Sequence, residues 1–248
     1  MGYISVETAD GPAEAYLASA REEAAPGVIL YMDALGLRPQ IAEMCERIAG
    51  WGYAVLAPNV FHREGSVAEL APRADMRTPE GRDEVIAAAK PRIGRLDTDR
   101  AERDVDAYIR ALRSLAEVRD GRVATVGFCM GARLAIRTAG RHPDSVALAA
   151  GFHGGGLVTG DSDSPHLAIA SARAALLFGH ADNDPGMTPE NAATLDTAAR
   201  DAGLQCSSAI YPDAPHGYTM ADTVMYQEQG AERAFAALRE ALGRHLPA

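Results

Sequence analysis

Short apolar runs alternate with amphipathic stretches along most of this chain. The apolar runs predict six strands, near residues 28–32, 53–57, 122–127, 146–151, 174–179 and 205–211. Between them, apolar residues recur at the three- and four-residue spacing of a helix, most clearly over Asp104–Val118 and Ala231–Leu242. Strands that alternate with helices usually pair in parallel, so the pattern predicts an α/β fold with a mostly parallel central sheet flanked by helices.

The start of the chain departs from this alternation. Apolar and polar residues alternate over Tyr3–Val6 and Ala13–Leu17, and between these runs lies Asp10-Gly11, a pair typical of tight hairpin turns. We therefore expect an N-terminal antiparallel hairpin. The charged stretch 63–103 lacks a strand pattern and predicts helices and loops, either as a lid or as a plain surface excursion. No internal repeat divides the chain, so we expect one domain over residues 1–248.

The amino-acid composition excludes some classes of protein. At 248 residues and 47% hydrophobic content, the chain can bury one large core. A net charge of −10 without a basic run disfavours a nucleic-acid partner. The three cysteines are too few for a disulfide framework, and the seven histidines form no metal-ligand spacing, so we expect neither metal nor cofactor.

Targeting signals are not evident in the sequence. Met1–Pro12 has neither the basic start nor the apolar run of a signal peptide, and no later run is long enough to span a membrane. Together with the unpaired cysteines, this predicts a protein of the reducing cytoplasm, without a membrane partner. No leucine-rich seam or exposed aromatic run predicts obligate assembly, so we expect a monomer.

The strongest chemical signal lies where the third of the six strands ends. The run Val123–Phe128 leads through Cys129 into a helical pattern, with the spacing G-x-C-x-G from Gly127 to Gly131. In a nucleophile elbow, such glycines allow a tight strand-to-helix turn that exposes the central side chain. A thiol there lies at the positive end of a helix dipole, which favours thiolate. The motif predicts a covalent nucleophile; the alternative is a buried, apolar cysteine.

Two further side chains follow in the order that such a nucleophile requires. An acid-bearing loop, 181–185, follows one predicted strand, and His216 follows the next. Nucleophile, acid and base in this order are typical of α/β-hydrolases. An imidazole takes the thiol proton and later activates water, while a carboxylate fixes the tautomer of the imidazole. Because the carboxyl ends of parallel strands share one edge of a sheet, we expect the three groups to meet there.

Four motifs spread over most of the chain carry a family resemblance. They are G-F-C-M-G from Gly127, A-D-N-D-P from Ala181, Y-P-x-A-x-H-G-Y ending at Tyr218, and the strands and crossover of 28–61. Together they resemble the dienelactone hydrolases, also called carboxymethylenebutenolidases, of the α/β-hydrolase superfamily. The resemblance implies a single α/β-hydrolase domain that acts on small esters or lactones through a covalent acyl-enzyme.

Position by position, the resemblance implies that Cys129 is the nucleophile, His216 the general base and Asp184 the acid that orients the base. Asp182 lies in the same loop and is the alternative acid. The acid of the family precedes a short apolar stretch with proline that opens a helix, and the residues after Asp184 fit this without a gap. Thr188 then serves as the helix N-cap with proline next to it, which favours Asp184.

The resemblance also implies which groups surround the thiol. It predicts an oxyanion hole made by the backbone N–H groups of Met130 and Ala34. In the family, an acidic residue at the position of Asp33, usually glutamate, touches the resting thiol and helps govern its ionisation. Aspartate is one methylene shorter, so either its backbone lies closer to Cys129 or this control is weaker. The alternative for Asp33 is a turn residue at the end of a strand.

Two positions depart from the family pattern. Dienelactone hydrolases carry an arginine four residues after the catalytic histidine, where it grips the substrate carboxylate, and here that position is Met220. A thioether cannot replace a bidentate cation, so dienelactone itself is not identified as the substrate. The second departure, Ala132 in place of a common glycine, is mild. Arginines that remain candidates for an anion anchor follow the second parallel strand: Arg63, Arg73, Arg77 and Arg82.

The run His153-Gly154-Gly155-Gly156 matches the oxyanion motif of lipases, but that motif belongs before the nucleophile, and here it follows Cys129. We expect its glycines to let a loop approach the pocket, with His153 lining the pocket wall.

Other functions use parts of the same pattern. A class I glutaminase also has G-x-C-x-G but expects a His-x-Glu pair, which His216-Gly217-Tyr218 lacks. A thioesterase or acyltransferase would use the same triad with a different pocket. A non-catalytic ligand-binding module would keep the fold, but the retention of all three triad residues disfavours it. The partner we expect is therefore a small-molecule ester or lactone.

Overall fold

A computed structural model describes residues 1–20 and 23–248 of the chain. The described residues form two compact units. Unit 1 comprises residues 1–121, 222–224 and 248, apart from 21–22, and unit 2 comprises residues 122–221 and 225–247. Each unit combines strands with helices, and the two units are described separately.

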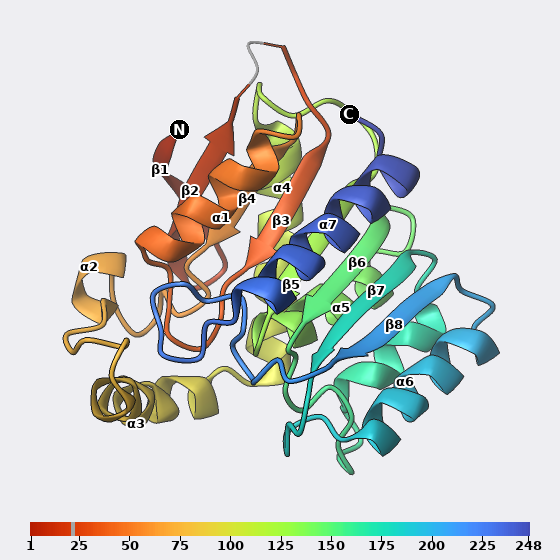
Figure 1. Cartoon of the computed structure of the whole chain (residues 1–248). Helices are drawn as coiled ribbons and strands as arrows, with labels where there is room; N and C mark the ends of the chain where they lie inside the picture. Colours follow the sequence, from red (N-terminus) through yellow and green to blue (C-terminus); the bar gives the residue numbers. More distant parts are fainter. Residues whose placement is uncertain (21–22) are drawn as a thin grey trace. The chain divides into compact units, whose positions relative to one another are not determined.

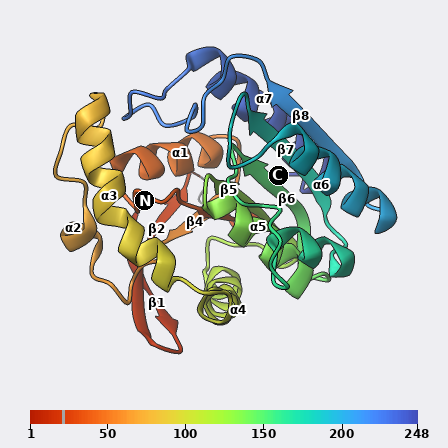
Figure 2. The same ribbon diagram turned by 90° about the horizontal axis from the view of Figure 1, so that it is seen from below.

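Unit 1 holds four strands in the order β1-β2-β4-β3. Its elements in chain order are β1 (Gly2–Thr8), β2 (Gly11–Ser19), β3 (Gly27–Tyr31), α1 (Pro39–Ala49), β4 (Ala54–Pro58), α2 (Val67–Leu70), α3 (Pro79–Arg95) and α4 (Thr98–Ser114). Strands β1 and β2 form the predicted antiparallel hairpin, β2 runs antiparallel to β4, and β3 runs parallel to β4. Helix α1 covers one face of these strands and α4 covers the other (Figure 2).

The apolar runs explain why β3 and β4 form where they do. All five residues of each strand are buried, as expected for strands covered on both faces. The turn of the hairpin depends on Gly11, whose φ of 113° a side chain would rarely adopt. On the α4 side, the rings of Tyr31 and Tyr108 pack 6.4 Å apart within the core of unit 1.

Unit 2 holds four parallel strands in the order β5-β6-β7-β8. Its elements are β5 (Val123–Phe128), α5 (Gly131–Arg141), β6 (Val146–Phe152), the 3₁₀ helix η1 (Pro165–Ser171), β7 (Ala175–Ala181), α6 (Pro189–Asp201), β8 (Cys206–Tyr211) and α7 (Glu228–His245). Helices α5 and α6 lie on one face of the strands and α7 on the other (Figures 1 and 2). The carboxyl ends of all four strands therefore point to one edge.

Aromatic side chains fill the core of unit 2. Phe128 and Phe152, on neighbouring strands, stack with ring centres 5.6 Å apart, and Phe235 of α7 lies 6.3 Å from Phe128. Burial of such large apolar side chains is the main force that holds the helix layer on the strands.

Each predicted strand lies within one or two residues of an observed strand, so the strand predictions are confirmed. The helix boundaries were less accurate. Helix α4 begins at Thr98, six residues before the predicted start, because Asp97 caps it by accepting a hydrogen bond from the backbone N–H of Arg100. Its first turn is polar, so apolar spacing did not reveal it. The charged stretch 63–103 forms helices and loops, as predicted.

Candidate active site

Cys129 lies in a strained turn between β5 and α5. Its φ of 54° is left-handed, which is uncommon for a residue other than glycine. A Cβ atom at Gly127 would overlap the carbonyl group of Gly131 one turn later, so the turn accepts only glycine at that position. This is the local reason why the sequence G-x-C-x-G forms an elbow. Strain of this kind concentrates at functional sites.

The elbow presents the thiol to an imidazole. Cys129 is a free cysteine and partly exposed, and its Sγ lies 3.0 Å from Nε2 of His216. Met130, which follows it, is the N-cap of α5. The thiol thus lies at the N-terminal end of a helix, where unpaired N–H groups and the helix dipole favour negative charge.

His216 lies in the loop that follows β8, here called the histidine loop (residues 212–220). Its Nδ1 atom lies 2.6 Å from Oδ2 of Asp184, so the ring bridges a carboxylate and a thiol. Burial by itself lowers the pKa of His216. The hydrogen bonds with Asp184 and Cys129 outweigh it and raise the pKa from 6.5 to about 10. The site therefore favours the imidazolium form of His216.

Asp184 comes from the loop after β7 and is 8% exposed. Burial raises the pKa of this carboxyl group, but the hydrogen bonds from His216 and from the backbone N–H of Gly186 have the larger combined effect and lower it. Asp182, the alternative acid, instead accepts a hydrogen bond from the backbone N–H of Asp213 at 2.9 Å. The structure thus brings Asp184, and not Asp182, against His216.

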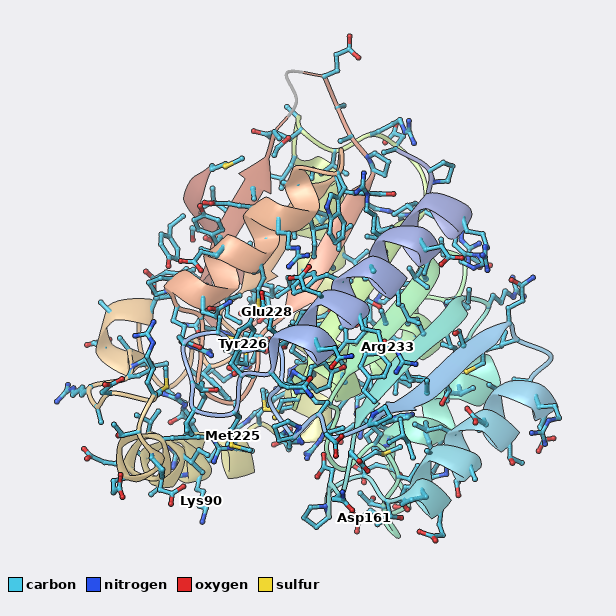
Figure 3. All side chains as sticks on the ribbon, viewed as in Figure 1. Lys90, Asp161, Met225, Tyr226, Glu228 and Arg233 are labelled. Carbon is cyan, nitrogen blue, oxygen red and sulfur yellow. The ribbon has the colours of Figure 1, made fainter. Side chains whose placement is uncertain are left out.

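Backbone and side-chain hydrogen bonds hold the histidine loop on the strand ends. The hydroxyl of Tyr218 donates to the carbonyl oxygen of Gly179 at 3.0 Å, and Gly217 adopts a φ of 95°. Arg233 of α7, labelled in Figure 3, lies with its guanidinium 4.1 Å from the ring centre of Tyr211, just before the loop. Met225, also labelled there, lies in the connection that leads from the loop to α7.

His153, which we expected to line the pocket wall, is fully buried. It directly follows β6 and has a left-handed φ of 38°. Its Nε2 atom lies 2.7 Å from Oγ1 of Thr219 in the histidine loop, and its ring lies edge-on to His216 at 5.4 Å. Sequence reasoning missed the pairing with Thr219. The only signal in the sequence was that His153 follows a strand at the same edge as the other site residues.

Ala132 has a structural explanation in two glycines, one within β6 and one in the loop that follows it. A Cβ atom at Gly154 would come within 2.9 Å of the methyl group of Ala132, and one at Gly151 within 3.0 Å. The glycines on the β6 side thus leave the space that Ala132 occupies on α5. Met220 is buried at the end of the histidine loop, where its backbone N–H donates to the carbonyl oxygen of Gly217.

Asp33 and Ala34 belong to unit 1, so their expected roles beside Cys129 stay predictions. Asp33 is buried and paired with Arg38 through two hydrogen bonds of 2.6 and 3.0 Å. Arg38 also binds Asp222, through Nε at 2.6 Å and Nη2 at 3.1 Å. This buried ion network was not foreseen, since Asp222 lies 184 residues from Arg38 in the sequence.

Of the arginines considered as anion anchors, Arg63 is engaged elsewhere. It binds the buried Asp104 through two hydrogen bonds of 2.7 Å and also donates to Asp10. Among the described residues, no group of three or more acidic, histidine or cysteine side chains could hold a metal ion. Of the helices in the described ranges, none is long and apolar enough to cross a membrane.

A carboxylate, an imidazole and a thiol in hydrogen-bonding sequence can withdraw a proton from sulfur and return it later. Comparison with known proteins shows which proteins the chain resembles. A carboxymethylenebutenolidase of Cupriavidus pinatubonensis is 29% identical over 143 residues, which are 58% of this chain and 56% of that protein. A protein of Methylorubrum extorquens, provisionally named a carboxymethylenebutenolidase, is 24% identical over 245 residues, or 96% of this chain and 79% of that protein.

Solved structures show the fold. A dienelactone hydrolase-like promiscuous phosphotriesterase from metagenomic libraries matches with a TM-score of 0.77 and 20% identity, covering 98% of each chain. An esterase of Pyrobaculum calidifontis matches with a TM-score of 0.68 and 17% identity, covering 99% of this chain and 86% of the other. Their likeness shows the α/β-hydrolase fold. The sequence model of the dienelactone hydrolase family matches residues 13–246, and the chain therefore belongs to this family of hydrolases.

Proposed function

We propose that this protein hydrolyses small carboxylic esters or lactones with a catalytic triad of Cys129, His216 and Asp184. One observation carries the proposal: His216 lies within hydrogen-bonding distance of both partners, 3.0 Å from the thiol and 2.6 Å from the carboxylate. The raised pKa of His216 supports a resting state in which the imidazole carries a proton. Membership of the dienelactone hydrolase family supports the ester or lactone substrate.

The reaction proceeds in two halves. The thiolate of Cys129 attacks the substrate carbonyl, and a tetrahedral oxyanion forms. As the intermediate collapses, the C–O bond breaks and the leaving alkoxide takes a proton from the imidazolium of His216, which leaves a thioester on Cys129. Neutral His216 then takes a proton from water, the hydroxide attacks the thioester, and the thiolate leaves. Asp184 keeps His216 in the tautomer that both halves require.

The oxyanion needs donors fixed in advance. We assign this role to the backbone N–H of Met130, at the N-terminus of α5, and to the backbone N–H of Ala34. We assign Asp33 the control of thiol ionisation, with Arg38 holding its carboxylate. With Met220 in place of an anchoring arginine, the preferred substrates are esters or lactones without a carboxylate. The proposal includes a monomer in a reducing cytoplasm with no nucleic-acid partner, for which the net charge of −10 and the free thiol are the support.

The test is hydrolysis of a panel from p-nitrophenyl acetate to protoanemonin and dienelactone by the wild type, Cys129→Ala and Cys206→Ala. Cys206 is also a free, partly exposed cysteine, so its variant controls for general loss of a thiol. We expect Cys129→Ala to lose about a thousandfold or more in kcat, while Cys206→Ala keeps full activity. Full activity in Cys129→Ala would refute the triad. Activity on acyl-thioesters alone would indicate a thioesterase.

A further inference from the structure

His153 and Thr219 form a buried contact next to the imidazole ring of His216. Nε2 of His153 and Oγ1 of Thr219 are 2.7 Å apart, although 66 residues separate them in the sequence. The ring of His153 meets the ring of His216 edge-on at 68°, and it meets the ring of Tyr218 edge-on at 5.0 Å. His153 thus touches three of the residues that make up the histidine loop.

His153 cannot serve as a second base, because its side chain is fully buried and its Nε2 is occupied by Thr219. Burial, with a smaller effect of the neighbouring His216, holds the pKa of His153 well below its ordinary value, so its ring is neutral. Its Nδ1 is buried and has no hydrogen-bond partner among the described residues. The hydrogen bond between Nε2 and the hydroxyl of Thr219 therefore fixes the orientation of the buried ring.

The groups that hold the ring of His216 differ between the two halves of the reaction. Before acylation, the ring is held at both nitrogens, by Asp184 at Nδ1 and by the sulfur of Cys129 at Nε2. After acylation, the sulfur is bonded to the acyl carbon and no longer forms the hydrogen bond with Nε2. The ring then depends on Asp184 and on its packing, which includes the contact with the ring of His153.

We propose that His153, fixed by Thr219, is a positioning residue that keeps His216 aligned to activate water during hydrolysis of the acyl-enzyme. This inference rests on the proposed function, since it concerns the second half of that reaction. The contact matters little for acylation by p-nitrophenyl acetate, because Cys129 holds the ring until it attacks and p-nitrophenolate leaves without needing a proton. A displacement of about an ångström in a catalytic group can reduce a rate about a hundredfold, so the effect falls on one step and is measurable.

The test compares Thr219→Val, which removes the hydroxyl, with Thr219→Ser, which keeps it. His153→Phe is a third variant that keeps a flat ring but cannot form a hydrogen bond with Thr219. Rapid mixing with p-nitrophenyl acetate gives the rate of acylation from the first turnover and the overall rate from the steady state. Intact-protein mass measured after rapid quenching gives the fraction of enzyme that carries an acetyl group.

For Thr219→Val and His153→Phe we expect acylation close to the wild-type rate, a steady-state rate about ten- to a hundredfold lower, and a raised acetylated fraction. Thr219→Ser should restore wild-type behaviour. Equal loss in both steps, or an unchanged acetylated fraction, would overturn the inference. If His153→Phe does not fold, the Thr219 pair decides. Failure of the proposed function is distinguishable, because the wild type would then carry no acetyl group on Cys129.

Discussion

Nδ1 of His216 lies 2.6 Å from Oδ2 of Asp184, while the carboxylate of Asp182, two residues earlier, binds the backbone of the histidine loop at Asp213. Asn183, between the two acids, has a left-handed φ of 53°, which turns the chain sharply at this point. The two acids therefore have different tasks. Asp184 contacts the imidazole, and Asp182 braces the loop that carries it.

This division predicts different effects for the two asparagine variants. We expect Asp184→Asn to lower kcat by about a thousandfold or more, because an amide can hold His216 in the wrong tautomer. Asp182→Asn keeps an acceptor oxygen for the backbone N–H of Asp213, so kcat should stay within about threefold of the wild type. Steady-state kinetics on p-nitrophenyl acetate measures both. The reverse ranking would assign the triad acid to Asp182.

The pKa of His216 predicts how stability depends on pH. Because folding raises this pKa from 6.5 to about 10, the stabilisation is complete below pH 6.5 and is lost as the pH rises through about 10. For Asp184, whose pKa folding lowers, the stabilisation is present above its ordinary value of 3.8 and is lost as the pH falls below it.

Denaturant unfolding of the wild type and of His216→Gln measures this effect, because glutamine does not titrate. The difference in free energy of unfolding should be largest below pH 6.5 and should shrink, by on the order of a few kcal/mol, as the pH approaches 10. A difference that stays constant over this range would contradict the raised pKa.

The buried ion network of unit 1 predicts a large effect on stability. Arg38 is 3% exposed and forms ion pairs with both Asp33 and Asp222. Arg38→Met leaves Asp33 as a buried, unpaired charge, so we expect a loss of about 3–5 kcal/mol in the free energy of unfolding. Arg173→Met is the control, because Arg173 and its partner Asp144 are both exposed and contribute less than about 1 kcal/mol. Equal effects of the two substitutions would contradict the prediction.

The elbow predicts contrasting effects for two glycine substitutions. A Cβ at Gly127 would overlap the backbone of Gly131, so Gly127→Ala must displace the turn that carries Cys129, and activity should fall about a hundredfold or more. Gly94 lies in α3 with open space around its Cα, so Gly94→Ala should stabilise the protein by about 0.5–1 kcal/mol at full activity. Thermal unfolding and ester hydrolysis measure both. A fully active Gly127→Ala would show that the turn can adjust.

Local sequence was sufficient to predict the strands and the elbow. The strands at β3, β5 and β6 are continuous apolar runs because both faces are covered, and such runs are visible in the sequence. The elbow depends on backbone conformations within five residues, so its glycines mark it without reference to the rest of the chain. Helix ends were predicted less well, because a cap such as Asp97 stabilises a polar first turn that has no apolar face.

The order of Cys129, the acid loop and His216 was sufficient to predict that one sheet edge would gather them, because parallel strands align their carboxyl ends. Only the tertiary structure showed that Asp184 rather than Asp182 contacts His216, that His153 contacts Thr219 and that Arg38 pairs with Asp222. The last two join residues 66 and 184 positions apart. Hydrogen bonds and ion pairs depend on distances of a few ångström, which the packing of the chain determines. The spacing of two residues along the sequence does not predict such distances.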